Sequence, residues 1–417
     1  MRKKWLILLM VMVLLFSACA APVPPPEDTY TSEAPSEVQE TPPPTIEIPS
    51  VPLTAGVPYR INAGGGHSLL ITDDGSLWSW GWNDSGQIGN RDFGPPDQCR
   101  PFRVMEDVVA VAAGDRHTVA VTDDGALWTW GCNLNGQLGD GTWRDRARPR
   151  RIMENVIAVS AGETHTMAIT ADGVLWGWGS NMYGQVGIDI GDRLRSNTLF
   201  LNTPVQIMED VVAVSAGWWY TMAITADGVL WGWGDNRGGQ IDGDTSIRFH
   251  YPPVQIKEGV IAVSAGGAHT MAITDDHVLW AWGDNLVGQL GDGTTIDRHY
   301  PVEIMGDVVA VSTRGGHSMA ITADGVLWGW GVNDIGRLGD GTTENRDRPV
   351  QIMEDVVAVS AGLFHTLAIT ADGALWGWGG NLVGQLGDGT SEDRHVPIRI
   401  LLDAGEQAVS VPLASRR

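Results

Sequence analysis

This chain of 417 residues has few cysteines, few basic residues and little sign of helices, and each shortage excludes something. It has only three Cys and shows neither a glycine-rich phosphate loop nor zinc-ligand spacing, so we predict no cofactor and no metal. Lys and Arg number 27 against 50 Asp and Glu, and the net charge of −23 argues against a nucleic-acid partner. The apolar run at residues 5–16 is too short to span a bilayer comfortably, and helical periodicity does not appear after it.

The N-terminus has the pattern of an export signal. Three basic residues precede the apolar run, and Phe16-Ser17-Ala18-Cys19 follows it. This stretch resembles the lipobox of bacterial lipoproteins, which implies that residues 1–18 are a signal peptide and that Cys19 is acylated. Ordinary secretion after the same signal is the alternative. Both predict an exported protein, lipid-anchored on the outer side of a bacterial membrane or secreted.

Residues 19–54 are predicted to form a disordered tether. Ten prolines and no glycine lie between positions 20 and 54, a composition that cannot bury a core. At about 3.1 Å per residue, such a tether could hold the following domain up to roughly 100 Å from a membrane. Residues 46–48 resemble a strand of the later repeats and are the one ordered piece that we expect there.

The rest of the chain is organised around Leu-Trp-x-Trp-Gly, which occurs seven times at intervals of 48 to 55 residues. Alternate side chains of a strand share a face, so both Trp of a pair should point to the same side. The residue between them is always small, as expected where rings of a neighbouring sheet press close. We therefore predict sheets stacked face to face. The Trp pairs are Trp78/Trp80, Trp128/Trp130, Trp176/Trp178, Trp231/Trp233, Trp280/Trp282, Trp328/Trp330 and Trp376/Trp378.

Each repeat contains four short strands bounded by turn signals, so the fold class is all-β. Asp-Gly, a strong hairpin signal, follows the second strand in six repeats. In the fifth repeat Asp276-His277 replaces it, so His277 should adopt a strained positive φ. The last strands are predicted at residues 102–105, 151–153, 205–208, 254–257, 302–305, 350–353 and 396–401.

Seven four-stranded meanders could close into a seven-bladed β-propeller of antiparallel blades over residues 55–403. The repeats resemble the regulator of chromosome condensation repeat family. Its pattern of Ala-Gly-x-x-His, Asp-Gly, Leu-Trp-x-Trp-Gly, Asn-x-x-Gly-Gln-Leu-Gly and Asp-Gly-Thr is matched in full at residues 361–390. The resemblance implies a seven-bladed propeller. Residues 404–417 are predicted to be a tail or a closure strand, since either 46–48 or 408–411 could interlock the ring.

Three further departures from the pattern lie in the fourth and sixth repeats. Tyr220 stands where the other six carry His, Arg337 stands where the others carry Gln, and Thr313-Arg314 replaces one Ala-Gly. A recurring His cannot be a unique catalytic base, so we interpret these histidines as structural.

Two further features leave alternatives open. Asp-Gly-Thr with a following Arg, as in Asp292 and Arg298, indicates a turn with an ion pair, and calcium is the alternative. The sequence does not decide whether Cys99 and Cys132 form a disulfide.

The meander sorts the loops onto two faces of the ring. The Asp-Gly hairpins and the connections between repeats share one face, which is acidic and repeats with little change. The Gly-x-x-His and Asn-x-x-Gly-Gln loops share the other, where the repeats differ, and blade three carries a long insertion at residues 188–202. We predict partner binding on this variable face; the alternative is that its aromatic rings line the channel and pack on one another. The candidate residues are Trp82, Met182, Tyr183, Trp218, Trp219, Tyr220, Leu363 and Phe364.

The leading hypothesis is a monomeric, membrane-tethered propeller that binds a cell-envelope or secreted protein and has no catalytic activity. One alternative is an inhibitor of β-lactamase or another cell-wall enzyme, because the chain resembles exported bacterial propellers that inhibit β-lactamases. A second is binding or hydrolysis of cell-wall glycan or peptide, for which Asp115, Glu163 and Asp235 are the candidate carboxyl groups. Nucleotide exchange on a GTPase, the activity of the eukaryotic namesake, does not fit an exported protein.

Overall fold

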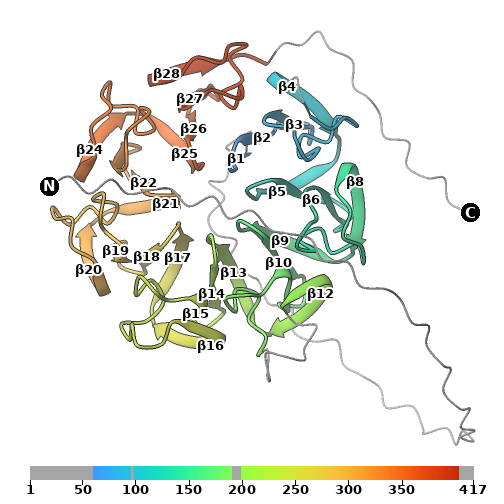
Figure 1. Cartoon of the computed structure of the whole chain (residues 1–417). Coiled ribbons are helices and arrows are strands. Elements are labelled where there is room, and N and C mark those ends of the chain that lie inside the picture. Colours follow the sequence, from blue (N-terminus) through green and yellow to red (C-terminus); the bar gives the residue numbers. More distant parts are fainter. Residues whose placement is uncertain (1–59, 95–97, 190–198, 403–417) are drawn as a thin grey trace, which may run out of the picture. The chain divides into compact units, whose positions relative to one another are not determined.

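The computed structural model describes residues 60–94, 98–189 and 199–402, and within them 28 strands form seven four-stranded sheets (Figure 1). Each sheet consists of four consecutive strands in antiparallel order, and the first strand of each lies nearest the centre of the ring. The all-β, seven-bladed prediction is therefore confirmed. The predictions for residues 1–18, Cys19, 19–54, 46–48 and 404–417 lie outside the described residues.

The seven sheets are called blades one to seven in chain order. Blade one contains β1 (Arg60–Ala63), β2 (His67–Ile71), β3 (Leu77–Gly81) and β4 (Gln98–Met105), and blade two β5 (Val108–Ala113), β6 (His117–Thr122), β7 (Leu127–Gly131) and β8 (Arg146–Met153). Blade three contains β9 (Val156–Ala161), β10 (His165–Thr170), β11 (Leu175–Ser180) and β12 (Phe200–Met208), and blade four β13 (Val211–Ala216), β14 (Tyr220–Thr225), β15 (Leu230–Asp235) and β16 (Phe249–Lys257). Blade five contains β17 (Val260–Ala265), β18 (His269–Thr274), β19 (Leu279–Gly283) and β20 (Arg298–Met305). Blade six contains β21 (Val308–Arg314), β22 (His317–Thr322), β23 (Leu327–Gly331) and β24 (Arg346–Met353), and blade seven β25 (Val356–Ala361), β26 (His365–Thr370), β27 (Leu375–Gly379) and β28 (Arg394–Ile400).

The hairpins between second and third strands form as the Asp-Gly signal predicts. Gly75 and Gly125 turn with φ of 76° and 75°, and Gly75 donates its N–H to the Thr72 carbonyl at 2.9 Å. His277 adopts a φ of 62° in the same turn, which confirms the predicted positive φ. A left-handed conformation costs a non-glycine residue roughly 1–2 kcal/mol, so this hairpin is strained.

The outer strands are longer than predicted. In blade five, β20 begins at Arg298, whereas the β-branched run predicts a start at residue 302. Pro301 misled the prediction, because proline is excluded from central strands but tolerated on edge strands. The pairing of β19 with β20 shifts register between Ala281 and Gly283, where the outer strand passes this proline.

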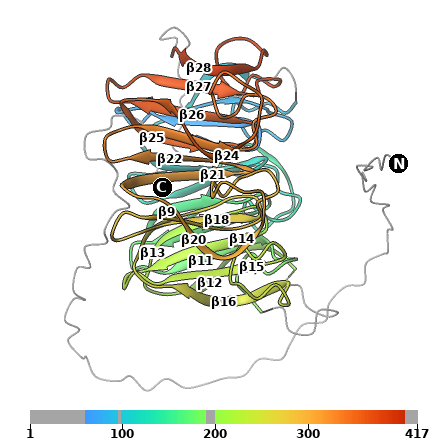
Figure 2. The same cartoon turned by 90° about the vertical axis from the view of Figure 1, so that its left-hand side faces the viewer.

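Paired indole rings fill the space between blades. Trp130 of blade two is fully buried against Leu77 and Val104 of blade one, and Trp128 packs beside it. Both rings of a pair thus lie on the same side of the strand, as predicted, and this side faces the preceding blade. Figure 2 shows the ring of blades from the side.

The reason for the small residue between the two Trp differs from the prediction. A Cβ added at Gly177 would meet Met167 and Val186 of its own blade at 3.0 Å, not a neighbouring indole. The neighbouring indole presses instead on the second glycine of Gly-Gln-Leu-Gly. A Cβ at Gly139 would lie 2.8 Å from Nε1 of Trp178 in the next blade.

A buried hydroxyl group links every pair of neighbouring blades. Thr118 of blade two donates its hydroxyl to the Gln87 carbonyl of blade one at 2.8 Å, and the same oxygen lies 3.0 Å from Nε2 of His67. Because the hydroxyl hydrogen is already used, the His must donate from Nε2, and burial, which lowers the pKa of His67 well below its usual value, keeps the ring neutral. The equivalent hydroxyl groups are Ser68, Thr118, Thr166, Thr221, Thr270, Ser318 and Thr366.

The same link closes the ring between blades seven and one. Ser68 donates to the Gln385 carbonyl at 2.7 Å and lies 2.7 Å from Nε2 of His365, while the Trp80 indole donates to the same carbonyl at 2.9 Å. Each blade is built from four consecutive strands, so within the described parts of the chain no strand is exchanged between its two ends. Among the described residues, closure depends on side-chain packing, on these hydrogen bonds, and on the N–H groups of Leu363 and Ala63, which donate to the Gly64 carbonyl at 3.0 Å and to the Ser360 hydroxyl at 2.9 Å.

The buried histidines predict acid sensitivity. Burial lowers the pKa of His117, His165 and His365 to about 3 and that of His269 to about 4, below the unfolded value of about 6.5. Their stabilising effect is complete above pH 6.5 and is lost as the pH falls towards the folded values. Each should remove about 1.4 kcal/mol of unfolding free energy per pH unit in that window. Urea unfolding at pH 7.5, 6 and 5 measures the slope of the unfolding free energy against pH.

Two variants separate this effect from general acid destabilisation. His117→Gln should reduce the slope by about one histidine's share, about 1.4 kcal/mol per pH unit. His277→Gly, which removes an exposed His, should leave the slope unchanged. A slope that His117→Gln does not alter would contradict the neutral buried histidine.

Candidate protein-binding surface

Two loops of each blade lie side by side on one face of the ring. In blade four, the N–H of Asp235 donates to the Trp219 carbonyl at 2.9 Å, joining the Asn-x-x-Gly-Gln loop to the loop that precedes the second strand. The same bond recurs in every blade, for example from Cys132 to Arg116 and from Gly380 to Phe364. We call this side of the ring the variable face.

Blades three and four place an aromatic cluster around one arginine on the variable face. The Tyr183 ring centroid lies 5.4 Å from those of Trp219 and Phe249, and Trp218 lies 5.9 Å from Trp219. The Arg237 guanidinium lies 5.3 Å from the Tyr183 ring, 5.4 Å from Trp219 and 5.8 Å from Phe249. Sequence analysis predicted the Trp and Tyr residues but missed Phe249 and Arg237. Arg237 could have been found, because it is the one cation at the first variable position of the Asn-x-x-Gly-Gln loops.

The guanidinium is held in place by a buried carboxylate. Nε and Nη2 of Arg237 donate to the two oxygens of Asp235 at 2.9 and 2.8 Å, and Asp235 is only 4% exposed. A bidentate pair of this kind fixes the orientation of the side chain. Asp235, one of the three predicted carboxyl candidates for catalysis, is therefore occupied by Arg237.

Tyr220 is not part of this surface, which corrects the prediction. Its side chain is fully buried, and its hydroxyl donates to the His269 carbonyl and lies 3.1 Å from the Thr270 hydroxyl. Tyr220 thus occupies the His position of the hydroxyl link between blades four and five.

The remaining predicted residues lie on other blades. The Trp82 ring stacks against Arg116, 4.6 Å from the guanidinium, and Phe364 lies 5.8 Å from Arg337. Met182 and Phe364 are 48% and 42% exposed, while Trp82 and Leu363 are half-buried. The predicted set is therefore divided between the blade three and four cluster and separate positions on blades one and seven.

Exposed apolar loop tips are a feature that sequence analysis missed. Leu134, Leu286 and Leu382 occupy the position equivalent to Met182 and are 69%, 72% and 82% exposed. Side chains this exposed contribute little to folding, and several on one face are typical of an interaction surface. The signal was available at the residue directly after each loop Asn.

The mouth of the central channel lies on the same face and carries Arg314. Its Nη1 donates to the Ala113 carbonyl of blade two at 2.7 Å, although Arg314 belongs to blade six. Burial raises the pKa of Asp115 and of Glu163, and the charge of Asp115 raises that of Glu163 further. The Trp219 side chain lies close enough to the Glu163 carboxyl group to lower its pKa in part, so the aromatic cluster continues to the channel mouth.

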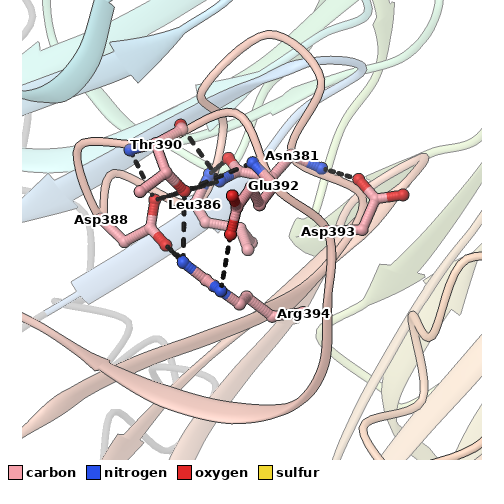
Figure 3. A network of polar contacts seen from close by, with 7 residues as sticks. All are labelled: Asn381, Leu386, Asp388, Thr390, Glu392, Asp393 and Arg394. Atoms are coloured by element: carbon pink, nitrogen blue, oxygen red, sulfur yellow. Dashed lines mark hydrogen bonds and ion pairs between the residues drawn. The ribbon is translucent and has the colours of Figure 1, made fainter.

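The Asp-Gly-Thr loops contain the predicted ion pairs (Figure 3). In blade seven, Asp388 accepts from Thr390 at 2.7 Å and from the Nη2 of Arg394 at 2.8 Å, and Asn381 ties the loop to Asp393. Asp292 and Arg298 make the equivalent pair at 2.6 Å. The carboxylate oxygens that the calcium alternative requires are thus engaged by arginine and threonine.

The two described cysteines, Cys99 and Cys132, do not form a disulfide. A Cβ at Gly384 of blade seven would lie 2.6 Å from the Cys99 sulfur, whereas burial raises the pKa of the Cys132 thiol and the nearby Ser85 of blade one partly offsets this. Cys99 therefore faces blade seven and Cys132 faces blade one.

The opposite face repeats with little change. The Thr72 and Thr122 hydroxyls donate to Asp74 and Asp124 at 2.6 Å, which lowers the pKa of both carboxyl groups. The hairpins remain charged and solvated there, so the variable face is the chemically distinctive side of the ring.

Comparisons with known proteins agree with this architecture. A family described as RCC1-like domain matches residues 31–354, and the regulator of chromosome condensation (RCC1) repeat matches residues 356–385 and 372–412. The chain belongs to the RCC1-like domain family. Sequence analysis identified the same repeat, so that prediction is confirmed for the propeller; the bacterial lipoprotein form stays a prediction.

Several solved structures share the fold at low sequence identity. The structure of human WBSCR16 is 24% identical with a TM-score of 0.69, over 78% of this chain and 94% of that one. Prp20p of Saccharomyces cerevisiae, described with its binding to Gsp1p and histones, is 20% identical with a TM-score of 0.68, over 78% and 86%. A structure of Kap60 bound to yeast RCC1 (Prp20) also matches, at 20% identity and a TM-score of 0.68, over 89% of this chain and 91% of that one.

A curated relative gives a much shorter match. The RCC2 homolog of Xenopus laevis is 56% identical over 41 residues, which is 9% of this chain and 8% of that protein. In the described part of the chain, no helix has the length and apolarity needed to cross a membrane.

Tyr220 provides a test of its structural placement. Tyr220→His restores the residue of the other six blades and should change the free energy of unfolding by less than about 1.5 kcal/mol. Tyr220→Ala should cost about 3–5 kcal/mol, because it leaves a large cavity. Urea unfolding measures both, and equal stability of Tyr220→Ala and wild type would contradict the buried placement.

Proposed function

We propose that this propeller is an exported protein-binding module, tethered to the outer side of a bacterial membrane by a lipid on Cys19, with its partner on the variable face. The observation that carries the proposal is the difference between the two faces. One presents exposed Leu134, Leu286 and Leu382 and an arginine-centred aromatic cluster, while the other repeats acidic hairpins. Tyr, Trp and Arg are the residues most enriched in the energetic centres of protein interfaces.

The arginine favours a protein partner over a glycan. Sugars stack on open aromatic faces, but Arg237 lies over the rings of Tyr183, Trp219 and Phe249. Fixed by Asp235, it presents a preorganised donor within an apolar surround, which suits a protein interface. One fold relative, Prp20p (yeast RCC1), is described as binding proteins in both of its matching structures, and binding by this chain is inferred from its own surface.

The lipid anchor rests on the sequence of residues 1–19. A basic start, an apolar run and Ser-Ala-Cys support export and acylation. A monomeric propeller on a proline-rich tether would reach partners in the cell envelope or outside it. We propose binding without catalysis, because Asp235 is engaged by Arg237, and Asp115 and Glu163 are within electrostatic reach of the Arg314 guanidinium.

A second candidate is inhibition of β-lactamases or other cell-wall enzymes. The exposed aromatic cluster is the kind of surface that can anchor on an enzyme rim. Inhibition assays against a panel of purified β-lactamases test it, and Arg237→Ala should weaken any inhibition at least tenfold. If the protein inhibits no enzyme of the panel, this candidate function is wrong, whereas the proposal of protein binding is tested separately by the surface variants.

The surface is tested by variants in blades three and four. Trp218→Ala with Trp219→Ala should weaken binding of an envelope protein, first identified by crosslinking to the wild type, by tenfold or more. Tyr300→Ala is the matched control, because Tyr300 is an aromatic residue of an outer strand that is 70% exposed. Equal loss in both variants, or no loss in the double variant, would contradict the assignment of the surface.

The tether is tested by Cys19→Ser. Without the acylated thiol, the protein should move from the membrane fraction to the soluble fraction, and labelling with a radioactive fatty acid should cease. Continued membrane association of the unlabelled variant would show that the lipid on Cys19 is not the anchor.

A further inference from the structure

The channel mouth carries both signs of charge on residues that break the repeat. Six blades have glycine at the position of Arg314. Asp115 and Glu163 are the two acidic residues at the first variable position of the Gly-x-x-His loops, on neighbouring blades two and three. A feature that seven repeats do not share is not needed to build a blade.

Most N–H donors of the Arg314 side chain have no acceptor among the described residues. One donor reaches the Ala113 carbonyl at 2.7 Å, and no carboxylate of the described residues lies within ion-pair distance of the guanidinium. Burial lowers the pKa of Arg314, partly offset by the charges of Asp115 and Glu163. Four of its five N–H donors remain for another group.

The Glu163 carboxyl group can still accept a hydrogen bond. Its Oε2 is buried and has no hydrogen-bond partner among the described residues, although such atoms are nearly always paired in folded proteins. The Trp219 side chain lies close to this carboxyl group, and Trp218 lines the cavity.

The cavity behind the mouth is small and polar. It has a volume of about 130 Å³ and is lined by the first strands of all seven blades, by Trp218 and by Arg314. A water needs about 10–15 Å³ of such volume, so there is room for a small amino acid. The wall hydroxyls of Ser160, Ser215 and Ser312 each accept a backbone N–H at 2.9 Å, which leaves their own hydrogens available to donate.

We propose that the channel mouth binds a small zwitterion of the amino-acid type. Its carboxylate would lie on Arg314 and the serine hydroxyls, and its ammonium group on Glu163 and Asp115 with Trp218 alongside. An anion alone would meet two carboxyl groups, and a cation alone would meet the guanidinium. A molecule with both charges satisfies both. This site lies in the channel and does not depend on the proposed protein partner.

Calorimetry with the full-length protein tests the proposal. The probes are L-alanine and D-alanine. The controls are propionate, which carries only the negative charge, and ethylamine, which carries only the positive charge. At least one enantiomer of alanine should bind ten times more tightly than either single charge. Absence of alanine binding at millimolar concentration, or equal binding of propionate, would overturn the proposal.

The variants use residues that the repeat already tolerates. Thr313→Ala with Arg314→Gly restores the Ala-Gly of other blades, should fold normally, and should weaken alanine binding at least tenfold; Glu163→Gln should do the same. Arg337→Gln is the matched control, because it removes another partly buried arginine and restores the Gln of six blades. Unchanged affinity in the Arg314 variant, or an equal loss in Arg337→Gln, would contradict the site.

Discussion

The structure depends on the hydroxyl group that joins each blade to the one before it. This group donates to the loop carbonyl of the preceding blade and accepts from its histidine, as Thr118 does with Gln87 and His67. The buried indole of the same blade donates to that carbonyl in most junctions, as Trp130 does at 2.8 Å. These bonds fix the distance between blades, so His, Thr or Ser, Gln and Trp recur while the outer loop tips vary.

The repeat constraint also explains where function can lie. A residue that forms the hydroxyl link cannot change without disturbing the neighbouring blade, whereas loop tips of the variable face such as Leu134, Leu286 and Leu382 are exposed and take no part in that link. Singular residues therefore gather there, including Arg237, Arg314 and Glu163. Arg337 replaces the Gln whose carbonyl accepts the hydroxyl link in the other blades. At this contact between blades six and seven, the buried Trp378 indole has no hydrogen-bond partner among the described residues.

The fold was predictable from sequence because the seven units repeat the same packing chemistry. The alternation of residue types predicts the strands, the Asp-Gly pairs predict the hairpins, and the Trp pairs predict the stacking of the sheets. All three patterns indicate the same four-stranded unit. The site was less predictable. Tyr220 was assigned to the surface although it occupies a position whose six histidines were already interpreted as structural. Arg237 and Phe249 were missed because one lies in the loop after β15 and the other begins β16, so that only the folded blade brings them together, and a contact across the channel such as Arg314 to Ala113 has no sequence signature.

Hydrogen exchange of the indole N–H groups tests the central claim most directly. Among the described strands, blades seven and one are joined without an exchanged strand, so the Trp80 indole must be held by the Gln385 carbonyl as Trp130 is held by that of Gln87. Exchange followed by NMR should show Trp80 as slow as Trp130 and Trp178. Exchange of Trp80 that is orders of magnitude faster than in those two would show that the ring opens at this junction and that side-chain links do not close it.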